Sequence, residues 1–164
     1  MKHTLSIMVR NESGVLSAIS GLFSSRGYNI ESLTVAPTLD TEFSRITIVT
    51  IGDDKVIEQI CKQLNRLINT IKIVDVTGEN NLDRELVLIK VSARDDGRSE
   101  VLRIAEIFDA KIVDVSPKTY TLQVVGDETQ VRSIIELLRP LGIKELVRSG
   151  KVAISRENQF MSVK

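Results

Sequence analysis

The sequence contains one pattern of hydrophobic and turn residues twice, and this internal repeat limits the possible folds more than any other feature. Residues 46–64 read ITIVTIGDDKVIEQICKQL, and residues 120–138 read YTLQVVGDETQVRSIIELL. In both segments a strand-like run leads to glycine, aspartate and an acidic residue, and then to a helix-like run with one apolar face. A chain with such a repeat is expected to form two copies of one structural unit.

Each copy is predicted to follow the order β-α-β-β-α-β. Alternating apolar residues mark the strands, and apolar residues three and four positions apart mark the helices. Two helices on one face of a four-stranded antiparallel sheet form the ferredoxin-like arrangement. The predicted fold class is therefore α+β, with two tandem ferredoxin-like βαββαβ domains. In the first copy the predicted elements are strands 5–9, 30–35, 43–51 and 71–74, a helix that ends in Phe23, and a helix with an apolar stripe from Val56 to Ile68.

Composition and turn residues suggest where the domains and helices end. Gly27 is expected to cap the first helix, Asp53 to begin the second, and Asp127 with Gln130 to begin the corresponding helix of the second copy. The predicted domains are residues 1–77, a polar linker over 78–83, residues 84–156, and a flexible tail over 157–164, where hydrophobic periodicity is lost.

Charge and composition exclude several classes of protein. The formal net charge is zero, aromatic residues make up 4% of the chain, and tryptophan is absent, so nucleic-acid binding is not expected. The strand over residues 43–50 carries a single phenylalanine, whereas an RNA-binding sheet needs exposed aromatic residues there. No run is long enough to span a membrane, and no signal peptide is recognisable. A cytoplasmic location is expected, which suits a chain with one cysteine.

The residues needed for catalysis or metal binding are not grouped in this sequence. His3 is the only histidine, and Cys61, the only cysteine, lies on the apolar stripe of a predicted helix, where a core role is expected. The paired acidic residues fall at turns and helix starts, where they cap and solvate. No phosphate-binding or dinucleotide-binding motif is present. We therefore predict no catalytic residue and no metal site.

The loop over residues 10–16 has features suited to an amino-acid ligand. A helix N-terminus attracts a carboxylate, and Gly14 allows the backbone to approach it closely. Asn11 adds an amide, and the oxygen of Asn29 at the start of the second strand could accept a hydrogen bond from a ligand ammonium. The residues alone leave a second interpretation open, in which Asn11 or Ser13 is a helix cap and Asn29 is a turn residue.

These same residues resemble a known family. The string NESGVL at residues 11–16, followed by GLFSSRGYNIESLTVAPT at residues 21–38, resembles the small regulatory subunit of acetohydroxyacid synthase, also called acetolactate synthase. RELVLIKV at residues 84–91 and RSG at residues 148–150 are also similar to that family, so the resemblance covers nearly the whole chain.

The resemblance implies an ACT domain over residues 1–77 and an ACT-like domain over residues 84–156. It implies a homodimer through the N-terminal ACT domains, with valine, or leucine or isoleucine, bound at their interface. It also implies a catalytic large subunit as partner, which would carry thiamine diphosphate, Mg and FAD, in branched-chain amino-acid biosynthesis. The small subunit would activate this partner and confer valine feedback inhibition. The residues that match the family's effector site are Asn11, Gly14, Val15, Leu16, Asn29 and Ile30.

The second copy lacks this effector pattern. Its equivalent loop over residues 93–99 has no asparagine and carries Asp95 and Asp96, which would repel a carboxylate. We expect it not to bind valine in the same way. The alternative function is an ACT-domain sensor of another amino acid that regulates a different enzyme.

Overall fold

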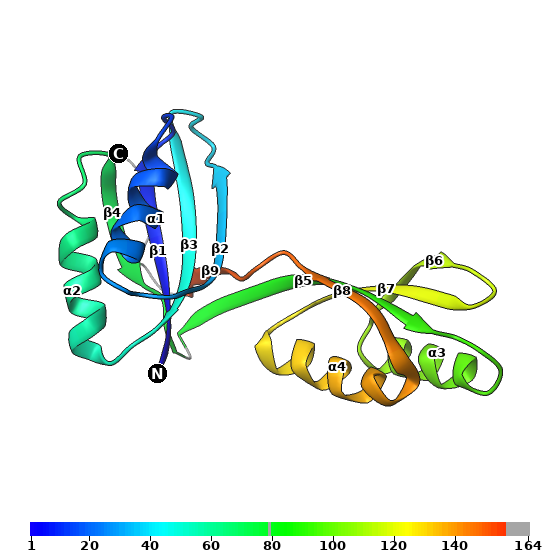
Figure 1. Ribbon diagram of the computed structural model, residues 1–164. Coiled ribbons are helices and arrows are strands. Elements are labelled where there is room, and N and C mark those ends of the chain that lie inside the picture. The colour runs from blue at the N-terminus through cyan, green and yellow to red at the C-terminus, as the bar shows by residue number, and fades with distance from the viewer. Residues whose placement is uncertain (79, 157–164) are drawn as a thin grey trace. The chain divides into compact units, whose positions relative to one another are not determined.

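The computed structural model describes residues 1–78 and 80–156, and they form two compact units. The first unit holds Met1–Leu82 together with residues from Lys151 on, and the second holds Asp83–Gly150. The predicted tail over 157–164 lies outside the described residues. Figure 1 labels the elements of both units.

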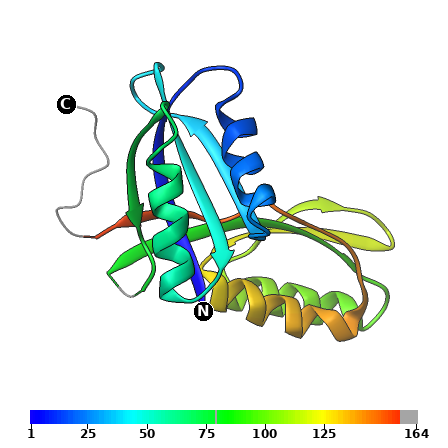
Figure 2. The same ribbon diagram turned by 60° about the vertical axis from the view of Figure 1, so that its left-hand side comes forward.

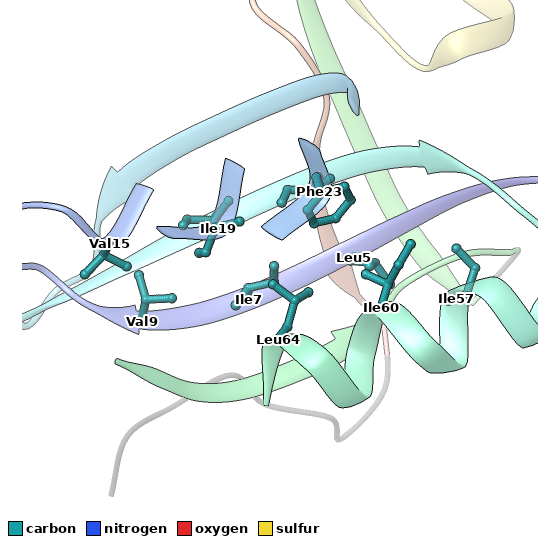
Figure 3. Close-up of a cluster of buried hydrophobic side chains, with 11 residues drawn as sticks. Leu5, Ile7, Val9, Val15, Ile19, Phe23, Ile57, Ile60 and Leu64 are labelled. Carbon is teal, nitrogen blue, oxygen red and sulfur yellow. The ribbon is translucent and has the colours of Figure 1, made fainter. Parts of the chain in front are cut away.

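In the first unit, two helices cover one face of an antiparallel sheet with strand order β2-β3-β1-β4 (Figures 1 and 2). Leu5, Ile7 and Val9 of the central strand are buried beneath both helices. Figure 3 shows apolar side chains at helical spacing on both helices, such as Ile19 and Ile60, packed beside them. The elements are β1 (Lys2–Arg10), α1 (Val15–Ser25), β2 (Ile30–Pro37), β3 (Phe43–Ile51), α2 (Asp54–Leu64) and β4 (Thr70–Asp75).

The second unit repeats this arrangement with strand order β6-β7-β5-β8 and its own buried cluster. Val87, Ile89 and Val91 of β5 correspond to the three core residues of β1. Its elements are β5 (Asn81–Ser92), α3 (Gly97–Ile107), β6 (Lys111–Val115), β7 (Thr119–Gly126), α4 (Glu128–Gly142) and β8 (Ile143–Arg148). The predicted α+β fold class with ferredoxin-like sheets is confirmed.

The repeated glycine and aspartate have the same structural role in both units. A Cβ on Gly52 would lie 2.8 Å from Val56 Cγ1, and one on Gly126 would lie 2.9 Å from Gln130 Oε1. Each glycine therefore leaves room for the first turn of the following helix. Asp53 accepts a hydrogen bond from the backbone N–H of Val56, and Asp127 forms a capping box with Gln130, as predicted.

A short strand beyond the second unit belongs to the first. β9 (Val152–Ser155) pairs with β5 and lies on the face of the first sheet opposite α1 and α2. Arg45 Nη2 donates to Ala153 O at 3.0 Å, and Thr34 Oγ1 donates to Lys151 O at 3.2 Å. The sequence placed residues 151–156 in the second domain, but their contacts group them with the first unit. Of the predicted linker over 78–83, residues 81–83 lie in β5.

The RSG motif at residues 148–150 joins the end of β8 to β5 by hydrogen bonds within the second unit. Arg148 Nε and Nη2 donate to the two carboxylate oxygens of buried Glu85, at 3.0 and 2.5 Å. This hydrogen bonding raises the pKa of Arg148. Ser149 exchanges hydrogen bonds with the backbone of Leu86, and Gly150 adopts a φ of 87° that favours glycine.

Candidate functional site

The loop between β1 and α1 is held by Asn11. The Asn11 N–H donates to Glu42 O at 2.7 Å, and Nδ2 donates to Thr41 O at 3.0 Å. These bonds fasten the loop to the turn between β2 and β3. Asn11 therefore does not cap α1, and neither does Ser13, because no side chain caps this helix.

The N-cap of α1 is Gly14, which has a φ of 85°. An uncapped helix start presents backbone N–H groups and partial positive charge, the combination that binds a carboxylate. A Cβ on Gly14 would meet nothing within 4 Å, so the space beside the loop is open. Val15 points into the core and can offer only its backbone, whereas the Leu16 side chain is 41% exposed.

Asn29 immediately precedes β2 and lies two residues after Gly27, which follows the end of α1. Its side chain is exposed, and Nδ2 donates to Glu31 Oε1 at 2.8 Å. Its backbone oxygen accepts from Thr50 Oγ1 at 2.6 Å, which fixes the residue to β3. Ile30 is half-buried and packs against the core. Asn29 thus immediately precedes β2, and its backbone oxygen is bonded to β3.

Within one chain, the two groups of predicted site residues lie at opposite ends of the sheet. Arg10, next to the loop, pairs with Phe43, whereas Ile30 pairs with Thr50. Phe43 and Thr50 are seven positions apart on β3, a distance of roughly 24 Å at about 3.4 Å per residue. The structure brings Asn11, Gly14 and Leu16 together and places Asn29 and Ile30 together, but it does not bring the two groups to one place.

The equivalent loop of the second unit is closed by an arginine. Arg98 Nε donates to Ala93 O at 2.8 Å, and Nη2 donates to Pro117 O at 2.7 Å. Asp95 takes the left-handed backbone with a φ of 47°. The start of β6 carries Lys111 where β2 is preceded by Asn29. Sequence reasoning missed Arg98, because its role depends on the turn between β6 and β7.

The single cysteine and the single histidine both lie in the first unit, and both are at least half-buried. Cys61 is half-buried, and desolvation raises the pKa of its thiol, with a further increase from the charge of Asp75. His3 is buried, with Nδ1 3.2 Å from Asp75 Oδ2. In residues 1–78 and 80–156 no group of three or more metal-ligating side chains is found, and no helix there is long and apolar enough to cross a membrane.

Comparison with known proteins gives matches over both units. A family model of the small subunit of acetolactate synthase matches residues 84–157, and a model of an AHAS small subunit-like ACT domain matches residues 5–72. The acetolactate synthase small subunit of Aquifex aeolicus is 54% identical over 99% of this chain and 84% of its own length. The acetolactate synthase isozyme 3 small subunit of Escherichia coli is 46% identical over 98% of this chain and 99% of its own.

A solved structure agrees with these matches. The crystal structure of the acetolactate synthase small subunit from Thermotoga maritima is similar to this chain with a TM-score of 0.88 and 38% identity. The similarity covers 96% of this chain and 99% of that one.

Proposed function

The chain belongs to the family of acetolactate synthase small subunits, and on that premise we propose that it is a non-catalytic regulatory subunit that activates a catalytic large subunit and confers feedback inhibition by valine. The observation that carries this proposal is the separation of the two groups of predicted site residues. The uncapped start of α1 and the Asn29 amide can bind one small amino acid only if two chains contribute.

The edge of the first sheet suits such a shared site. β2 is an edge strand, with backbone groups available for a further strand, and Val35 on it is 46% exposed. Two copies paired antiparallel through β2 would set the Ile30 end of one strand near the Pro37 end of the other. Asn29 of one chain would then face the loop with Asn11 and Gly14 of its partner. A two-fold axis would produce this site twice.

Each part of the ligand has a matching group in this arrangement. The carboxylate would dock on the N–H groups at the start of α1, beside Gly14. The ammonium would donate to Asn29, and the branched side chain would lie against Leu16 and Ile30. One methylene in such an apolar pocket changes affinity by about 1–3 kcal/mol, so leucine and isoleucine are expected to bind as weaker effectors.

Regulation follows from ligand binding across the two chains. Valine would stabilise one dimer geometry over another, and it can shift this equilibrium only by its difference in affinity for the two. Thiamine diphosphate, Mg and FAD are expected in the catalytic large subunit. The proposed assembly consists of the homodimer and this catalytic subunit. In it, the second unit serves either to dimerise the small subunits or to couple them to the catalytic subunit.

The test combines reconstitution with one substitution. Adding the chain to its catalytic subunit is expected to raise activity and to make it sensitive to valine. Asn29→Ala should weaken valine binding in calorimetry by about tenfold or more and keep activation, since one hydrogen bond to a charged group contributes about 1.5–3 kcal/mol.

Two results would contradict the proposal. An unchanged valine affinity in Asn29→Ala would remove the site assignment. Catalytic activity that responds to neither the chain nor valine would remove the regulatory role. A response to another amino acid instead of valine would favour the alternative sensor.

A further inference from the structure

The Asn29 amide is oriented by a neighbouring carboxylate. Nδ2 of Asn29 donates to Glu31 Oε1 at 2.8 Å, and both side chains are exposed. Because this bond uses the donor of the amide, it turns the acceptor, Oδ1, away from Glu31. A carboxylate is an acceptor only, so it holds the amide in this orientation and not in the flipped one.

A β-bulge lies at Glu31, beside Asn29. Ile30 pairs with Thr50 and Ser32 pairs with Val49, which leaves Glu31 as the extra residue of β2. Such bulges re-aim side chains at functional sites. The bulge lies at the edge of the sheet, where a ligand or a second chain can reach it.

The second unit also has a bulge, but it lies at a different place in the sheet. Ile112 pairs with Leu122 and Asp114 pairs with Thr121, so Val113 is the extra residue there. Leu122 and Thr121 correspond to Ile48 and Thr47 in the repeat and not to Thr50 and Val49. Counted from the ends of α1 and α3, the positions that correspond to Asn29 and Glu31 are Lys111 and Val113. Lysine and valine cannot form the amide–carboxylate pair of the first unit. A lysine at that position would repel an ammonium group.

We propose that Glu31 is a positioning residue of the effector site, which holds the Asn29 amide with Oδ1 toward the ligand and so makes the site selective for a protonated amine. This inference rests on the proposed function. An α-ammonium donates hydrogen bonds to Oδ1. The carbonyl of the 2-oxo acid with the carbon skeleton of valine would place one acceptor against another, and it is therefore rejected.

A double-mutant cycle on the full chain tests this role. Calorimetry with valine is measured for wild type, Glu31→Ala, Asn29→Ala and the double variant. Glu31→Ala is expected to weaken binding roughly tenfold, and the double variant should bind no more weakly than Asn29→Ala alone, within about twofold. Glu31→Gln should bind valine with an affinity between those of Glu31→Ala and wild type, because its carbonyl oxygen still accepts from Asn29 Nδ2 while its NH2 group can also donate to the flipped amide.

Controls separate this role from charge and from folding. Glu136→Ala removes the same charge from an exposed position in the second unit and should leave valine binding unchanged. Urea unfolding should be the same for wild type, Glu31→Ala and Glu31→Gln. The 2-oxo acid should bind wild type at least about a hundredfold more weakly than valine, and Glu31→Ala should narrow that gap.

The outcomes that overturn the inference differ from those that overturn the function. If the losses of valine affinity in Glu31→Ala and Asn29→Ala multiply in the double variant, Glu31 does not act through Asn29. A Glu31→Gln variant as weak as Glu31→Ala would assign the effect to charge rather than to positioning. If wild type binds no amino acid, the proposed function itself fails. If only Asn29→Ala loses binding, only the role of Glu31 fails.

Discussion

Gly14 is the residue whose backbone most directly shapes the start of α1. Its φ of 85° is costly for any residue with a Cβ, although a Cβ there would meet no atom within 4 Å. Gly14→Ala is therefore expected to lower the free energy of unfolding by about 1 kcal/mol through backbone strain alone. Urea denaturation followed by circular dichroism measures this change.

Gly21 provides the matched control in the same helix. It lies inside α1, also with open space around its Cβ position. Gly21→Ala should raise the free energy of unfolding by about 0.5–1 kcal/mol, because alanine is the better helix former. Equal effects of the two substitutions would contradict the role given to the Gly14 backbone.

Cys61 gives a residue-scale prediction that depends on pH. Because burial and the charge of Asp75 raise the pKa of its thiol, less thiolate is present at pH 8 than for an exposed cysteine. Alkylation by iodoacetamide should be several-fold slower in the native protein than in urea, and the difference should narrow as the pH rises. Equal rates at pH 8 would show that Cys61 is accessible and unperturbed.

Residue types predicted part of the candidate site. The special backbone of Gly14 and the place of Asn29 at a strand start could be read from local patterns, since both depend on neighbouring residues. The partners of Asn11 could not, because Thr41 and Glu42 reach it only through sheet pairing. Glu31 was missed because the sequence does not show that its exposed side chain turns toward the Asn29 amide.

The starts of α4 and α3 show how one residue type acts differently in two elements. Asp127 has extended backbone and completes a capping box, whereas Asp96 has helical backbone with φ −65° and makes no capping bond. Asp127→Ala should therefore cost about 1 kcal/mol of stability, and Asp96→Ala should change it little. Thermal unfolding of the two variants provides the comparison, and a larger loss for Asp96→Ala would refute it.

Most helices and strands were predictable because each has a long hydrophobic period. β9 was not, since it has four residues and its partners are distant in the sequence. Residues 81–83, which the sequence assigns to the linker, lie in β5, and strand pairing rather than composition sets where that strand begins.

At the scale of the whole molecule, β9 makes the first unit depend on residues that follow the second. Removing residues after Gly150 would expose the sheet face around Arg45, and burial already lowers the pKa of that guanidinium. This truncation should destabilise the first unit by about 2 kcal/mol or more through lost hydrogen bonds and buried surface. Faster hydrogen exchange in β1 and β3 should accompany the loss.

A chain that ends at Arg156 keeps β9 and is the reference for that comparison. Equal exchange in the two chains would show that β9 does not stabilise the first sheet. The repeat predicted both units from the sequence, but it could not reveal this shared strand, because β9 has no counterpart in the first copy.

The place of β9 in the chain also affects how the protein is made. Translation delivers Met1–Leu82 first, then the whole of Asp83–Gly150, and only afterwards the strand that covers the first sheet. Domains generally fold in the order of their synthesis, and contacts between distant residues form slowly. On the ribosome, the sheet face around Ser6 and Arg45 therefore lacks its contacts with β9 until that strand emerges.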